Sequence, residues 1–277
     1  MGESIDNHSA DRLPESSFVE SQLEATTGIW RALRESSQVA ECTIHLLLFS
    51  LDESTRTLLT LCHTGRLRDA FVISRVVYES ALNACFILAS GSGVAERAWR
   101  HAHQRSIRDL DRTIKIANQE FRVKWSEADS VLSDSANRAL LDEFTTAKGR
   151  EIPSWTPESV RQRLGAVINT FGFGRAKGLF FGILLYRHAS EIAHATVFGA
   201  LYALGAMDPR GRPRSVAELD AFRLEELRLI LMLVGYTLYA LVQVLGTQFS
   251  VEHSVNESVK SFHEYNRHHS TTSGDSG

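Results

Sequence analysis

The sequence predicts an all-α protein, a single bundle of about six to eight helices with disordered termini. Apolar residues recur at spacings of three and four along most of the 277 residues, which is the periodicity of amphipathic helices. The core shows no convincing strand alternation, no internal repeat and no low-complexity tract. We expect residues 18–253 to form the helical domain, and residues 1–17 and 254–277 to be disordered tails.

Composition and charge limit the possible partners. The chain is 43% hydrophobic and 23% charged, with a formal net charge of −3, so any nucleic-acid contact would have to come from a local basic patch. The cysteines Cys42, Cys62 and Cys85 stand singly, without C-x-x-C spacing. That usage suits a reducing cytosol, and residues 1–17 lack the apolar stretch of a secretory signal, so we expect a cytoplasmic protein.

The first two helices are expected at residues 18–36 and, after a short gap, up to His63, with a break at Thr64-Gly65. The third, Arg66–Ser90, is an apolar helix with Arg75, Glu79 and Asn83 every four residues. These side chains are either an intrahelical pair on a solvated edge or a buried, cleft-lining pair. The apolar flanks favour the buried pair.

A helix of different character is expected from Val94 to about Phe121, after the Gly91-Ser92-Gly93 break. Basic residues recur along it at spacings of three and four: Arg97, His101, Arg105, Arg108 and Arg112. This basic stripe is either a solvated face laced with ion pairs to nearby acidic residues, or a surface that contacts phosphate or RNA.

Weaker helical character follows at Trp125–Lys148, and the next helix should begin with Thr156 as N-cap and Pro157 in its first position. That helix should end near Thr170, and residues 208–213 should be a loop.

The last helix is expected at residues 216–253. It contains a charge-free stretch, Leu229–Val251, that is long enough to cross a membrane. Threonine and glutamine dilute the stretch, and aromatic and basic residues do not frame both ends, so we expect a buried bundle helix and no membrane span.

The central helix, Gly178–Gly205, is apolar but carries polar groups in its middle. Arg187, Glu191 and His194 lie at positions i, i+4 and i+7 and share one face. Tyr186 and Ser190 lie close by. Charged groups inside an apolar helix are costly unless they are paired, so the helix is a candidate functional site.

Three chemistries can be considered for this helix. Glu191-x-x-His194 has the spacing of a di-iron ligand pair, but only one such pair stands on a core helix, so we expect no metal and no cofactor. Ser190 with His194 lacks the strained elbow and oxyanion donors that acyl transfer needs. Arg187 with His194 suits metal-independent RNA cleavage, in which one group binds the phosphate and the other moves the proton.

Three motifs carry a resemblance to known families. Arg75-x-x-x-Glu79-x-x-x-Asn83 followed by Tyr186-x-x-x-Ser190-x-x-x-His194 resembles an uncharacterised bacterial all-helical family of unknown function, over roughly residues 50–205. Arg187-x(6)-His194 also resembles the motif of the HEPN superfamily of helical ribonucleases and RNA-binding modules. That resemblance implies a homodimer with a composite RNase site, in prokaryotic defence or stress systems, with an antitoxin or another protein as partner.

The leading functional hypothesis is therefore a HEPN-like, metal-independent ribonuclease or RNA-binding protein. Arg187 would hold phosphate and His194 would act as acid and base, oriented by Glu191 or Tyr186, and the basic stripe would add backbone contacts. Arg75 and Glu79 are expected to face the polar residues of the central helix across one internal cleft. The alternatives are a non-enzymatic interaction or small-ligand module with a buried Arg/Glu/His network and, third, a metal-dependent enzyme using Glu191 and His194.

Overall fold

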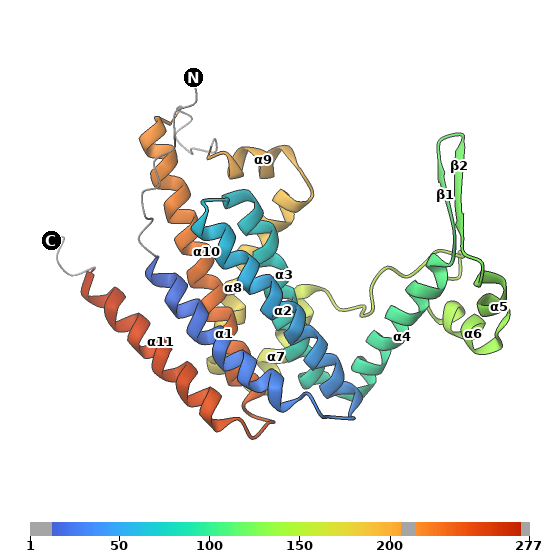
Figure 1. Cartoon of the computed structure of the whole chain (residues 1–277), viewed down its shortest axis with the longest axis horizontal. Coiled ribbons are helices and arrows are strands. Elements are labelled where there is room, and N and C mark those ends of the chain that lie inside the picture. Colours follow the sequence, from blue (N-terminus) through green and yellow to red (C-terminus); the bar gives the residue numbers. More distant parts are fainter. Residues whose placement is uncertain (1–12, 206–213, 273–277) are drawn as a thin grey trace.

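The computed structural model describes residues 13–205 and 214–272, and in that part of the chain it confirms the all-α class (Figure 1). It contains eleven helices and one two-stranded hairpin. In chain order these are α1 (Pro14–Ala32), α2 (Val39–His63), α3 (Leu67–Ser90), α4 (Ser92–Asp109), β1 (Asp111–Ile116), β2 (Gln119–Lys124), α5 (Ala128–Ser133), α6 (Ser135–Glu143), α7 (Val160–Phe171), α8 (Phe173–Ala193), α9 (Val197–Ala203), α10 (Val216–Leu245) and α11 (Glu252–Thr272).

Helix α3 lies at the centre of the bundle. It packs against α2, α7, α8 and α10, while α1 packs against α10 and α11. Its buried side chains include Phe71, Val77 and Leu82, which belong to one continuous apolar core with the inner faces of the surrounding helices. Burial of these faces is the main favourable contribution to the fold.

Two glycines allow α8 to approach its neighbours closely. A Cβ atom added to Gly178 would lie 1.8 Å from the backbone oxygen of Tyr236 on α10. A Cβ added to Gly182 would lie 2.6 Å from the ring of Tyr78 on α3. The positions of α3, α8 and α10 relative to one another therefore depend on the absence of side chains at these two residues.

An arm extends from the bundle. Helix α4 leads away from it, and the hairpin, α5 and α6 lie at its far end (Figure 1). The predicted helix over residues 94–121 is wrong in its second half, because the chain turns into antiparallel strands with Asp111 opposite Lys124 and Ile116 opposite Gln119. The turn places Ala117 at φ 52°. The charged residues at helical spacing concealed an alternation of apolar residues that is typical of a strand.

Both predicted tail boundaries need correction. Helix α1 begins at Pro14, because proline suits the first helical turn and Phe18 is buried immediately after it. The predicted helix over residues 216–253 is interrupted after Leu245, and the chain forms α11 where a disordered tail was expected. Helix α11 packs on α1, where the rings of Tyr265 and Phe18 stack with centroids 4.4 Å apart.

Two other helix boundaries differ from those predicted. The N-cap of α7 is Ser159 in a capping box with Gln162, rather than Thr156, so the helix begins three residues later than expected. The predicted helix over residues 178–205 begins earlier and breaks after Ala193, because Ala195 adopts φ 51° and Thr196 caps α9 by accepting a hydrogen bond from the Gly199 N–H. The two short helices α5 and α6 occupy the weakly helical region. The predicted loop at 208–213 lies outside the described residues.

Two helices in the described part, α3 and α10, are long and apolar enough to cross a membrane. In an apolar 18-residue stretch of α3, 61% is buried inside the bundle, and in that of α10, 67% is buried. Core helices of globular proteins share these properties, which agrees with the bundle position expected for the charge-free stretch.

Replacing Gly178 with alanine should destabilise the fold by about 1–3 kcal/mol, because the new methyl group would overlap backbone that cannot move cheaply. Urea denaturation of the full chain measures the change. Gly165→Ala is the matched control, since a Cβ there in α7 meets nothing within 4 Å and should stabilise the helix by about 0.5–1 kcal/mol. Equal changes in the two variants would contradict the close approach of α8 and α10.

Candidate functional site

Polar side chains from three packed helices meet beside the core, and we call this group the arginine–tyrosine cluster. Helix α3 supplies four members, and α7 and α8 supply one each. The members are Arg75, Tyr78, Glu79, Asn83, Arg163 and Tyr186.

Arg75 connects α3 to α8. Its Nε lies 3.5 Å from an oxygen of Glu79, one turn further along α3, and the two side chains are 22% and 31% exposed. Its guanidinium carbon lies 4.9 Å from the centroid of the Tyr186 ring, a cation–π contact. The Arg75–Glu79 pair is thus partly buried, and Arg75 reaches Tyr186 on α8. The sequence predicts that this pair faces Tyr186.

Arg163 connects α7 to α3. Its guanidinium donates a hydrogen bond to the side-chain oxygen of Asn83, and the residue is 9% exposed. Burial lowers the pKa of Arg163, against the opposing effect of the negative charge on Glu79. A buried arginine whose direct partner is a neutral amide retains an unmet demand for negative charge.

Tyr78 is fully buried. Its ring packs against Gly182 and lies 6.0 Å from the Tyr186 ring, measured between centroids. Burial raises the pKa of Tyr78, and the nearby positive charge of Arg163 opposes that rise. The hydroxyl therefore remains protonated at neutral pH and is available as a hydrogen-bond donor.

Two buried groups of the cluster, Tyr78 Oη and Arg163 Nε, lack a hydrogen-bond partner among the described residues. Among the same residues, Arg75 Nε has only its ion pair with Glu79 at 3.5 Å. The cluster holds two guanidinium groups and the Glu79 carboxylate; burial lowers the pKa of Arg163, and the negative charges of Glu79 and Glu158 both raise it. Buried donors normally have partners, and unmet ones cost free energy. The arrangement is therefore suited to a bound anion with several acceptor oxygens.

The residues predicted for catalysis lie apart from these contacts. Arg187 and His194 are exposed near the C-terminal end of α8, and His194 is its C-cap. Glu191 accepts a hydrogen bond of 2.9 Å from the Thr196 hydroxyl, and Ser190 donates to the backbone oxygen of Tyr186. Of the α8 side chains expected to face Arg75 and Glu79, Tyr186 is the one with a contact to this pair in the described structure.

The predicted orienting partners of His194 are thus engaged elsewhere. Glu191 supports the start of α9 through Thr196, and Tyr186 packs against Arg75. The described residues also contain no group of three His, Cys, Asp or Glu side chains placed to hold a metal ion. The local geometry of Glu191 is that of a helix-cap partner.

The basic stripe lies on α4 and β1. Its side chains contact the segment of the chain between Leu141 and Trp155. Arg97 donates to the Trp155 carbonyl, and Arg108 donates to the Leu141 carbonyl at 2.8 Å. Arg105 and Arg112 both pair with Glu151, at 3.6 Å and 3.2 Å. The arginines of the stripe therefore already have intramolecular partners, which is the arrangement expected for a face laced with ion pairs.

His101 is the buried member of the basic stripe, with 6% exposure. Its Nε2 lies 3.3 Å from the Ile152 carbonyl oxygen, so that nitrogen carries the donated proton. Its ring meets the Phe144 ring edge to face. Burial lowers the pKa of His101, so the neutral imidazole is the folded form.

Comparison with known sequences places the chain in a family. The profile of a family described as "Family of unknown function (DUF5677)" matches residues 41–211, more than half of the chain. The chain belongs to DUF5677. No curated protein and no solved structure matches it.

The DUF5677 match runs from α2 past α9 and so contains every member of the arginine–tyrosine cluster. Helices α1, α10 and α11 lie outside the matched residues. The expected membership of a family of unknown function is confirmed, over nearly the same residues as the resemblance. The cluster is therefore a feature of the DUF5677 part of this chain.

Sequence reasoning identified four cluster members and missed Tyr78 and Arg163. Tyr78 stands between Arg75 and Glu79, where its apolar neighbours make it look like a core aromatic. Arg163 shares a face with buried Val167 and Phe171 at spacings of four. An arginine within the apolar stripe of an amphipathic helix is unusual, and this position could have marked Arg163 as a buried functional residue.

The stability of the arm should fall in mild acid because of His101. Its folded pKa lies below the ordinary value of about 6.5, so the unfolded chain binds the proton first and stability is lost as pH falls below that value. His101→Gln should remove this contribution, which is at most about 1.4 kcal/mol per pH unit.

Urea denaturation between pH 7.5 and 5 measures the change. His103→Gln, at an exposed position of α4, is the control for a histidine lost from the same helix. An unchanged pH dependence in His101→Gln would contradict the buried neutral imidazole.

Proposed function

We propose that this DUF5677 protein binds a small phosphate-bearing ligand at the arginine–tyrosine cluster. The observation that carries the proposal is the pair of buried groups without hydrogen-bond partners, Tyr78 Oη and Arg163 Nε, beside the two guanidinium groups of the cluster. A phosphate group supplies several acceptor oxygens and negative charge together, and guanidinium groups bind it through paired N–H donors.

Burial favours binding over catalysis at this cluster. The raised pKa of Tyr78 keeps its hydroxyl protonated, so it is a poor base at neutral pH. A desolvated anion site strengthens each hydrogen bond to the ligand, because the surrounding dielectric is low. This is the small-ligand alternative considered from the sequence, with Arg163 in place of the expected histidine.

Tyr78→Phe gives the sharpest test, because it removes the unsatisfied hydroxyl and keeps the buried ring. Without ligand, the variant should be as stable as the wild type or slightly more stable, since no existing hydrogen bond is lost. Its affinity for inorganic phosphate should fall about tenfold, the loss typical of one hydrogen bond to a charged group. Isothermal titration calorimetry and thermal melting measure the two quantities.

Arg163→Gln should weaken phosphate binding further, while Arg161→Gln, an exposed arginine two residues earlier in α7, should leave it unchanged. Phosphate should also raise the melting temperature of the wild type more than that of Tyr78→Phe. Equal phosphate affinity in the wild type, Tyr78→Phe and Arg163→Gln would refute a phosphate site at the cluster.

A second candidate function is the metal-independent RNA cleavage expected from the HEPN resemblance. The observation in its favour is that Arg187 and His194 are both exposed near one end of α8, where RNA or a second copy of the chain can reach them. A homodimer would bring two such pairs together, as that resemblance implies. The basic stripe would contribute only by exchanging its intramolecular partners for phosphates.

Incubation of the full chain with mixed RNA in EDTA tests this candidate. Cleavage should be lost in both Arg187→Ala and His194→Ala and retained in Arg175→Ala, an exposed arginine near the other end of α8. Circular dichroism confirms that the variants are folded. Absence of cleavage by the wild type, or its retention in both site variants, would exclude these residues as the catalytic pair.

A further inference from the structure

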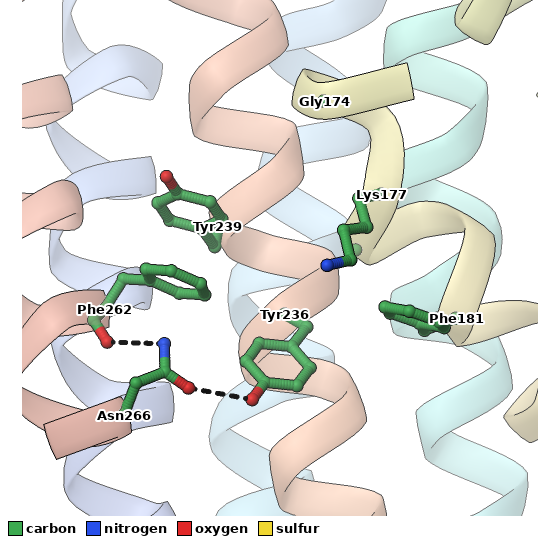
Figure 2. A pocket seen from close by; sticks show the side chains of 8 residues that line it. Gly174, Lys177, Phe181, Tyr236, Tyr239, Phe262 and Asn266 are labelled. Atoms are coloured by element: carbon green, nitrogen blue, oxygen red, sulfur yellow. Dashed lines mark hydrogen bonds between the residues drawn. The ribbon is translucent and has the colours of Figure 1, made fainter. Parts of the chain in front are cut away.

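A cavity lies between α8, α10 and α11 (Figure 2). Its volume of about 480 Å³ is in the range of small-molecule sites. Helices α10 and α11, which supply half of its lining, lie outside the DUF5677 match. The cavity is therefore independent of the cluster on which the proposed function rests.

Glycine residues of α8 give the cavity its space. Gly178 lets α10 approach so closely that Tyr236 reaches the lining. Gly174 also lines the cavity, and a Cβ atom added there meets nothing within 4 Å. Because Gly174 is a lining residue, a larger side chain at this position is expected to take up part of the cavity.

Aromatic rings form two opposing sides of the cavity. Phe181 lies on one side, and Tyr236, Tyr239 and Phe262 lie on the other (Figure 2). The rings of Tyr239 and Phe262 stack on each other with centroids 4.1 Å apart and an interplanar angle of 13°. Such walls favour a flat apolar ligand, because ring faces and edges pack well against another aromatic ring.

Lys177 is the one charged residue in the described lining. It lies between the two aromatic sides in Figure 2, and its ammonium is 5.6 Å from the centroid of the Phe181 ring. The other polar groups satisfy one another, since the Tyr236 hydroxyl donates to Asn266 at 3.1 Å and the Asn266 amide donates to the Phe262 carbonyl at 2.9 Å. No carboxylate in the described structure pairs with Lys177.

From this arrangement we infer that the cavity binds a small aromatic carboxylate. The aromatic ring of the ligand lies between Phe181 and the opposite side, which contains Tyr239 and Phe262. The carboxylate of the ligand pairs with the Lys177 ammonium. Burial of the ring supplies the apolar contribution to affinity, and the charge selects acids over amides and amines. The same lysine disfavours a cationic ligand, because like charges repel inside a partly enclosed site.

Titration of the full-length protein with 2-naphthoate, followed by isothermal titration calorimetry, tests the inference. The wild type should bind 2-naphthoate and bind the neutral 2-naphthamide about tenfold more weakly. In Lys177→Met the acid should lose about tenfold in affinity while the amide keeps its own, so the preference disappears. Failure of the wild type to bind 2-naphthoate, or a preference that survives in Lys177→Met, would overturn the inference.

Gly174→Leu tests the location of the ring. It should reduce the affinity for both probes more than tenfold, because the new side chain fills the cavity. Gly93→Leu is the matched control, since Gly93 is likewise the second residue of its helix and its added Cβ also meets nothing within 4 Å. Unchanged binding in a folded Gly174→Leu would overturn the inference. Tyr78→Phe should bind 2-naphthoate like the wild type, which separates this site from the phosphate site.

Discussion

The rest of the structure depends on the close approach of α8 to α3 and α10. Gly178 leaves room for the backbone of α10, and Gly182 leaves room for the ring of Tyr78 from α3. Helix α8 thereby becomes a wall shared by two different sites. One of its sides meets the arginine–tyrosine cluster through Tyr186, and another borders the aromatic cavity through Lys177 and Phe181. Side chains at these glycines would push the helices apart and disturb both sites.

The depth at which an arginine is buried, rather than the number of arginines, distinguishes the cluster from the arm. In the arm, Arg105 and Arg112 share the carboxylate of Glu151, and Arg108 donates to backbone carbonyls, so the guanidinium groups stabilise the local fold. In the cluster, Arg163 is more deeply buried and its direct partner is the neutral Asn83. Burying an arginine without a matching carboxylate is costly, and a ligand that carries the missing charge would recover part of that cost.

The arm adds a surface of a different kind. One face of the hairpin carries exposed apolar side chains, with Phe121 at 64% and Ile116 at 71%, beside Arg112 and Gln119. The opposite face is joined by ion pairs such as that between Arg122 and Asp111 at 2.5 Å. A two-stranded hairpin alone is marginally stable, so the ion pairs and the anchoring of α4 by His101 and its neighbours support it. The arm is thus held together largely by polar contacts, whereas the bundle is held together by its apolar core.

The sequence alone determined the all-α class, because a helix that buries one face has apolar residues recurring with a period of 3.6 residues along the chain. It also determined the course of α2 and α3 and the stripe of Arg75, Glu79 and Asn83, since i, i+4 neighbours on one helix need no tertiary information. The hairpin was hidden by charges at helical spacing, and the end of α8 by a single residue, Ala195, at positive φ. Only the tertiary structure brought Arg163 to Asn83, 80 positions away in the chain, and α11 to the cavity. Contacts of that kind leave no local period, because they depend on which helix faces meet rather than on the order of residues within one helix.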